Sequence, residues 1–175
     1  LFGLVASSVA QADIVYLVNR DIGTGSVVGT VTTDGSLGVL GTSNVTAWSL
    51  TIDEGDAEGS FLITEANSGF LVVGDGLTAT LNQLLFDFSG SGDMALWQNP
   101  VLGSRKNLWC VENTVNCTTM GPSVETVHRE GSFFTGQVAS RSGNVEIGTA
   151  QQSVPEPTSL ALLGFGLAGV AGLRR

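Results

Sequence analysis

The sequence predicts an all-β domain, an antiparallel β-sandwich, followed by a C-terminal apolar helix. Three observations support this fold class. Short runs rich in Val, Ile, Thr, Phe and Trp recur, separated by Gly, Asp, Asn and Ser at the spacing of a sandwich or barrel. No window between the two ends has a sustained helical period with caps. The last residues form a separate apolar run. Jelly-roll and immunoglobulin-like topologies both remain open.

The first residues have the pattern of the end of a signal peptide. The apolar run Leu1–Ala12 closes with Ala10-Gln11-Ala12, the small-x-small pattern that signal peptidase reads. We therefore expect residues 1–12 to be a residual signal peptide. Ala10 and Ala12 would mark its cleavage site, and the mature domain would begin at Asp13. An initiator Met and a basic stretch do not precede this run, so we expect N-terminal residues to be missing from the sequence.

The first third of the domain contains three strand-like runs: Asp13–Arg20, Ser26–Gly41 and Thr46–Gly55. In the second run, Asp34-Gly35 lies between two alternating segments, which predicts a hairpin with its turn at these residues. In the third run, alternate residues share one face of the strand: Trp48, Leu50 and Ile52. This alternation favours an antiparallel sheet with one solvated face.

The remainder of the domain continues the same pattern. Within Gly59–Gly92 the segments SFLITE, GFLVV, LTATLN and QLLFDF are predicted strands, with ANSG and GDG as turns. The best core candidates are Leu84, Phe86 and Phe88, with Trp48 opposite or adjacent. A loop is expected through Trp97 to Lys106, followed by strands at LWCVE, Val124–His128, SFFTGQV and NVEIG.

The predicted β-domain, residues 13–150, is strongly acidic. The whole chain has a net charge of −9 with 16 acidic residues, and all but Glu156 lie in the domain. Five of the seven Lys and Arg residues lie there too, so the domain carries −10. This balance argues against binding to nucleic acid or to anionic lipid by simple electrostatics.

The two cysteines, Cys110 and Cys117, permit a single intramolecular pairing. Because the signal peptide predicts export to an oxidising compartment, we expect a structural disulfide that closes a short loop. The alternatives are a metal pair and a redox dithiol. Zinc sites use closer cysteine spacing and further ligands, and His128 is the only histidine.

Candidate chemistry elsewhere is sparse. The segment Asp53–Gly59, DEGDAEG, gathers four carboxylates that could bind calcium, but its spacing does not match a calcium loop, and a charged hairpin tip explains it equally well. His128 is expected to be an exposed or hydrogen-bonded residue at a strand end. No nucleophile elbow or phosphate-binding loop is present. We therefore predict no catalytic residue, no metal site and no cofactor.

The tail, residues 151–175, has three parts. A proline-marked motif comes first: Val154, Pro155, Glu156 and Pro157. The uncharged run Leu160–Leu173 follows, and it would span roughly 21 Å as a helix, short of the roughly 30 Å hydrocarbon core. Its glycines weaken it further. Arg174 and Arg175 close the chain and should hold that end in the cytoplasm, with the domain on the outer side.

This three-part tail resembles the PEP-CTERM sorting signal. The resemblance implies recognition of Pro155, Glu156 and Pro157 by exosortase, a membrane protease of Gram-negative bacteria that make exopolysaccharide. Leu160–Leu173 would then be a transient membrane helix, and Arg174 and Arg175 the membrane stop. The precursor would be anchored in the inner membrane before the protein reaches the cell surface or is secreted. The body is similar to an uncharacterised class of PEP-CTERM β-domains.

Two functions follow as hypotheses. The first is a non-enzymatic component of the cell surface or of the extracellular matrix of a biofilm or floc. The alternative is an exopolysaccharide-binding module or a glycan-active hydrolase, in which an exposed Trp97 or Trp109 would stack on sugar rings. Tryptophans buried in the core would exclude the stacking role, because a sugar could not reach them.

Overall fold

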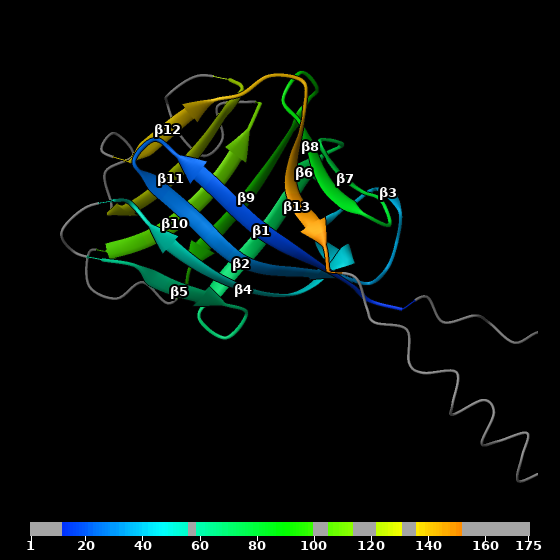
Figure 1. Ribbon diagram of the computed structural model, residues 1–175, viewed down its shortest axis with the longest axis horizontal. Coiled ribbons are helices and arrows are strands. Elements are labelled where there is room, and N and C mark those ends of the chain that lie inside the picture. Colours follow the sequence, from blue (N-terminus) through cyan, green and yellow to red (C-terminus); the bar gives the residue numbers. More distant parts are fainter. Residues whose placement is uncertain (1–11, 56–58, 100–104, 114–121, 131–135, 152–175) are drawn as a thin grey trace, which may run out of the picture.

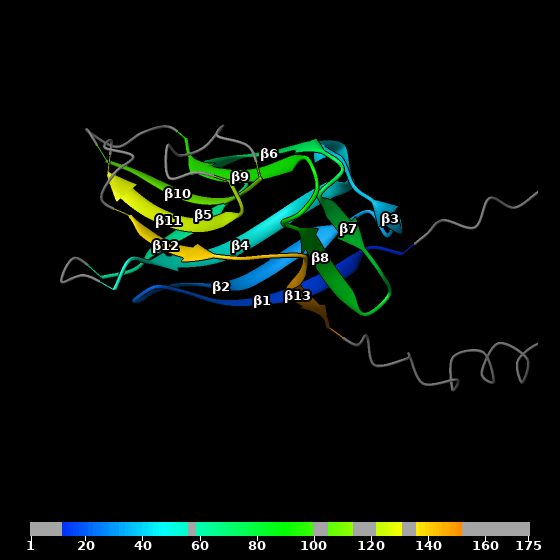
Figure 2. The same ribbon diagram turned by 90° about the horizontal axis from the view of Figure 1, so that it is seen from above.

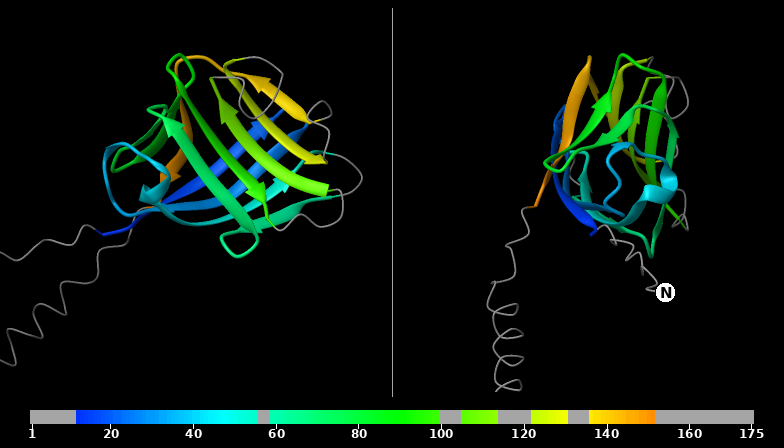
Figure 3. Two further views of the ribbon diagram at one scale, coloured as in Figure 1. Left: turned by 180° about the vertical axis from the view of Figure 1, so that it is seen from behind. Right: turned by 90° about the vertical axis from the view of Figure 1, so that its right-hand side faces the viewer.

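The computed structural model describes residues 12–55, 59–99, 105–113, 122–130 and 136–151, with the backbone alone at 105–106 and 129–130. These residues form two antiparallel sheets stacked face to face, and the two layers lie one above the other in Figure 2 and side by side in the right-hand view of Figure 3. The predicted all-β, sandwich-like fold is confirmed. The predicted apolar helix of the tail lies outside the described residues.

Sheet A has eight strands in the order β3-β7-β8-β13-β1-β2-β4-β5 (Figure 1). Their bounds are β1 Ile14–Ile22, β2 Gly25–Thr33, β3 Gly38–Val39, β4 Val45–Asp53, β5 Phe61–Thr64, β7 Leu77–Ala79, β8 Gln83–Asp87 and β13 Asn144–Ala150. A short 3-10 helix, Thr42–Asn44, precedes β4.

Sheet B has five strands in the order β12-β11-β10-β9-β6. Their bounds are β6 Ser68–Gly74, β9 Gly92–Gln98, β10 Arg105–Glu112, β11 Val124–Glu130 and β12 Gln137–Ser140. The chain changes sheet between β5 and β6 and again between β6 and β7, at the two predicted turns ANSG and GDG. These turns therefore connect the layers rather than hairpin partners.

The hairpin predicted at Asp34-Gly35 is wrong. A turn does occur there, with Gly35 at φ 83° and the amide of Ser36 donating to the Asp34 carboxylate. However, β2 already has β1 on one side and β4 on the other, so neither edge is open to the residues after the turn. Those residues form β3, which pairs with β7. The hairpin that does form joins β1 to β2, with Ile22 opposite Gly25.

Strand β9 was not predicted, and the loop expected from Trp97 to Lys106 is wrong at both ends. Trp97 belongs to β9 and Lys106 to β10. The strand lies between β6 and β10, and its inner face is buried while Ala95 and Trp97 on its outer face are half-buried. The outer-face residues Ala95 and Trp97 are apolar too, so the sequence lacks the alternation of apolar and polar residues by which a half-buried strand is recognised.

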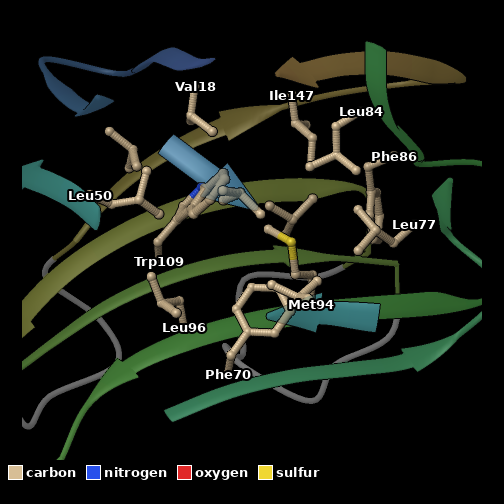
Figure 4. Packing of buried hydrophobic residues seen from close by; sticks show 14 of the residues in the cluster. Val18, Leu50, Phe70, Leu77, Leu84, Phe86, Met94, Leu96, Trp109 and Ile147 are labelled. Carbon is tan, nitrogen blue, oxygen red and sulfur yellow. The ribbon is translucent and has the colours of Figure 1, made fainter. Parts of the chain in front are cut away.

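The hydrophobic core lies between the sheets (Figure 4). The predicted core residues Leu84, Phe86 and Phe88 are each almost fully buried, so this prediction is confirmed. Trp109 of β10 is the largest fully buried side chain, and Leu96 of β9 and Val127 of β11 lie beside it in register. The Trp109 side chain belongs to the buried cluster between the sheets, which makes it a central element of the core.

Candidate functional site

The chain enters and leaves the domain at one place. Strands β1 and β13 pair antiparallel near the middle of sheet A, with Tyr16 opposite Ala150. Beyond that pair, the amide of Gln151 donates to the carbonyl of Val15 at 2.7 Å. The start of β1 and the end of β13 lie side by side in Figures 1 and 3. The tail that begins at residue 151 is thus attached beside the first strand.

The sorting motif and the residues that flank it are outside the described part of the chain. This holds for Val154–Pro157, for Arg174 and Arg175, and for Ala10 of the expected signal-peptidase site. Ala12 is described and is exposed just before β1. In the described ranges, no helix is long and apolar enough to cross a membrane.

Of the two cysteines, the structure describes Cys110, which is fully buried in β10. Its side chain lies in the row of Ala95 on β9 and Thr126 on β11, on the face of sheet B that points away from sheet A. Cys117 is outside the described ranges, so the disulfide between the two residues stays a prediction.

We expect Cys110→Ser and Cys117→Ser each to lower the free energy of unfolding by about 2–3 kcal/mol, since either change opens the same short loop. The double variant should be only slightly less stable than either single variant. Urea unfolding measures the loss, and mass spectrometry after alkylation without reduction counts free thiols. Alkylation of both cysteines in the unreduced wild type would contradict the pairing.

The three tryptophans have different environments. Trp109 is fully buried in the core, so the hypothesis that it stacks on a sugar is wrong. Trp48 is half-buried, donates through Nε1 to the Ser68 hydroxyl at 2.8 Å and packs on Phe70, with ring centroids 5.3 Å apart. Trp97 is half-buried on the outer face of sheet B, directly over Gly69 of β6. A Cβ at Gly69 would lie 2.6 Å from this ring, so the close contact requires glycine.

The acidic segment after β4 is described only in part. The Asp53 carboxylate accepts the amide of Gly55 at 2.7 Å and closes a turn, as expected for a hairpin tip. The Glu54 carboxylate lies 3.4 Å from Nδ1 of His128, which is buried in β11. His128 is therefore an interior residue beside a carboxylate rather than an exposed one. No group of metal-ligating side chains occurs within the described ranges.

A buried charge network, which was not predicted, joins the two sheets. Glu125 of β11 is fully buried and faces the core. Its carboxylate accepts two hydrogen bonds from Arg20 of β1, at 2.7 and 3.0 Å, and one from Nε of Arg141 at 2.9 Å. Trp109 donates to it through Nε1 at 3.2 Å. We call Arg20, Glu125, Arg141 and Trp109 the Glu125 network.

The Glu125 network is saturated with hydrogen bonds. Oε1 accepts from Arg20 and Trp109, and Oε2 accepts from Arg20 and Arg141. Each arginine also donates to a main-chain carbonyl, Arg20 to that of Glu146 and Arg141 to that of Asp21, both at 2.7 Å. A carboxylate held by four donors and closed to solvent cannot exchange a proton with a substrate, so its role is structural.

Two further carboxylates oppose each other across β9 and β10. Asp93 and Glu112 are register partners, and both are buried. The Asp93 carboxylate accepts the amide of Asn113 at 3.1 Å. Glycosidases also use paired carboxylates, but these must reach the glycosidic bond. With exposed fractions of 4% for Asp93 and 0% for Glu112, this pair is closed to a sugar.

The C-terminal end of the chain matches a known protein-family model. Residues 153–175 match the model of the PEP-CTERM protein-sorting motif, so the tail carries this motif. The match supports an exported protein sorted by exosortase, and it implies a precursor that is processed at the membrane. The comparisons with curated proteins and with solved structures each found no match.

Proposed function

We propose that the tail of this exported precursor is read and removed at the membrane, and that the β-domain then serves as a non-enzymatic component of the cell surface or extracellular matrix. The PEP-CTERM motif at residues 153–175 is the observation that carries the proposal. Exosortase is the processing partner. The motif determines the route of the protein, and the β-domain is the cargo.

Each part of the tail has a role in this route. Pro155, Glu156 and Pro157 are the recognition residues. Leu160–Leu173 is apolar, but at roughly 21 Å as a helix it is shorter than the hydrocarbon core, as suits a temporary anchor. Arg174 and Arg175 hold the end of the chain in the cytoplasm while the domain is outside.

The chemistry of the β-domain supports a non-enzymatic role. The Glu125 carboxylate is engaged by four donors, and the Asp93 and Glu112 pair is buried. His128 is buried next to Glu54. A general acid or base must reach its substrate, and none of these groups is open to solvent in the described structure. The net charge of −10 in residues 13–150 favours solubility after release.

Substitution of the recognition residue Glu156 tests the route. In the exosortase-containing source strain, Glu156→Ala should leave the full-length precursor in the inner-membrane fraction, since the motif is no longer read. Thr158→Ala, one residue beyond the motif, is the matched control and should be processed like the wild type. Cell fractionation followed by immunoblotting measures both. Normal release and shortening of the Glu156→Ala protein would overturn the proposal.

Exopolysaccharide binding is the second candidate function, and Trp97 is the observation that favours it. Its ring lies over Gly69 on the outer face of sheet B and is partly exposed, near the exposed side chain of Leu71. Aromatic rings in such positions can stack on sugars. A glycan array probed with the wild type and with Trp97→Ala tests this candidate, and binding lost in the variant would favour it over a purely structural role.

A further inference from the structure

Three exposed apolar side chains gather at the end of the domain where the tail is attached. Leu37, Val39 and Leu81 are 48%, 60% and 67% exposed, and Val39 and Leu81 are the most exposed large hydrophobic residues of the described domain. We call these three residues the apolar end. Single exposed leucine and valine side chains are ordinary, but apolar side chains that gather in one exposed area mark a candidate contact surface.

Backbone pairing places these residues together. Val39 of β3 is opposite Thr78 of β7, and Gly38 is opposite Ala79, so the next residue, Leu37, comes beside Thr80. Leu81 follows Thr80 in the turn between β7 and β8. The backbone thus brings the three residues near one another at this edge of sheet A.

The patch is adjacent to the attachment point of the tail. The amide of Ala150, the last residue of β13, donates to the carbonyl of Asn82 at 2.7 Å, and Asn82 follows Leu81 directly. Figure 1 shows β3, β7 and β8 at the end of the domain where β13 finishes. The chain thus continues into the sorting tail from a point next to the apolar end.

The two segments that contain the apolar end carry no charge of their own. Residues 35–45 and 76–86, which contain the patch, include no Asp, Glu, Lys or Arg, although the domain as a whole carries −10. Two acidic side chains nearby are held by hydrogen bonds. Asp34 accepts from the amide of Ser36 and from Asn44, which lower its pKa, and Glu146 accepts from Gln83 and Thr149. A surface whose own residues are uncharged meets less repulsion from lipid phosphates than the rest of this acidic domain.

The sequence limits how far this end can be from the membrane. Only residues 152–159 separate Gln151 from the start of the apolar run at Leu160. An extended chain of this length reaches at most roughly 30 Å, and less if it bends at the two prolines. Attachment of the tail therefore keeps the apolar end close to the bilayer for as long as the precursor is intact.

We propose that the apolar end rests on the outer leaflet of the membrane in the intact precursor, with Leu37, Val39 and Leu81 in the interfacial zone of the phospholipid. This inference rests on the proposed function, because it requires the tail to be inserted. Three side chains bind lipid weakly by themselves, but the tether raises their effective concentration at the surface. Removal of the tail ends this advantage, and the domain then leaves the membrane.

Fluorescence quenching by brominated phosphatidylcholine tests this contact. The full chain with Leu81→Trp is reconstituted into vesicles with brominated or ordinary acyl chains. The matched control is Leu62→Trp, because Leu62 is 53% exposed on β5, at the opposite edge of sheet A from β3. We expect brominated lipid to reduce the added emission of Leu81→Trp about two-fold and to leave that of Leu62→Trp unchanged.

Vesicle flotation of the same samples distinguishes failure of the membrane contact from failure of tail insertion. The inference is supported if the chain floats with the vesicles and brominated lipid quenches Leu81→Trp but not Leu62→Trp. If the chain floats but Leu81→Trp is not quenched, the proposed membrane contact is wrong, while insertion of the tail is still supported. A blue-shifted emission without quenching has the same meaning, because a second copy of the chain then covers the patch. If the chain does not float, tail insertion and the inference both fail.

Discussion

Replacing Glu125 by alanine is expected to lower the free energy of unfolding by about 3–5 kcal/mol, because it leaves two arginines without their shared counter-ion. Arg20 and Arg141 approach the same carboxylate oxygen at 2.7 and 2.9 Å. Without that oxygen, their positive charges face each other in a largely buried site. Urea unfolding of the full chain in mild detergent measures the loss.

Two matched variants control this experiment. Glu125→Gln keeps the shape of the side chain but removes its charge. Its free energy of unfolding should therefore lie between those of the wild type and Glu125→Ala. Glu65→Ala removes an exposed carboxylate from the turn between β5 and β6, and its effect should be within about 0.5 kcal/mol. A Glu125→Ala protein as stable as Glu65→Ala would show that the network does not hold the sheets together.

Replacing Trp109 by alanine is expected to destabilise the domain by about 3–5 kcal/mol, as for other large buried aromatic residues. The ring is fully buried between Leu96 and Val127 on neighbouring strands and packs in the centre of the core (Figure 4). Its removal leaves a cavity that the surrounding strands cannot fill.

Trp109→Phe separates packing from hydrogen bonding in the same experiment. Phenylalanine keeps most of the apolar contact but cannot donate to Glu125, so we expect a loss clearly smaller than that of Trp109→Ala. The difference between the urea midpoints of the two variants, multiplied by a common m value, gives the difference in their free energy of unfolding. Equal losses for the two variants would mean that the hydrogen bond to Glu125, rather than the volume of the ring, stabilises this position.

The local pattern of residues was sufficient to predict most strands. The runs beginning at Asp13, Thr46 and Gln83 became β1, β4 and β8, because each alternates between a buried and an exposed face or contains a clear apolar series. The core face of Leu84, Phe86 and Phe88 follows from the same period of two.

Pairing between distant strands could not be predicted. Asp34-Gly35 has the residues of a hairpin turn, but the neighbours of β2 are determined by β1 and β4 across the sheet. The residues around Asp34-Gly35 do not indicate whether β2 has a free edge. Strand β9 was missed for a related reason, because both of its faces carry apolar residues and its sequence therefore lacks alternation.

The Glu125 network also depends on distant contacts. Its ion pair joins residues 105 positions apart in the chain, Arg20 and Glu125. In the sequence, SVETV indicates a strand but does not indicate which of its faces is buried. The sorting motif is the opposite case: its residues are contiguous, so the sequence alone was enough to recognise it, and the family comparison confirmed it.

The mass of the mature protein tests the central claim most directly. The protein is purified from the outer fraction of a strain with active exosortase, and its C-terminal peptide is identified by mass spectrometry. We predict a chain that ends near Pro157 and lacks Leu160–Arg175. A mature protein that retains Arg174 and Arg175 in this strain would contradict removal of the tail, and with it the proposed route.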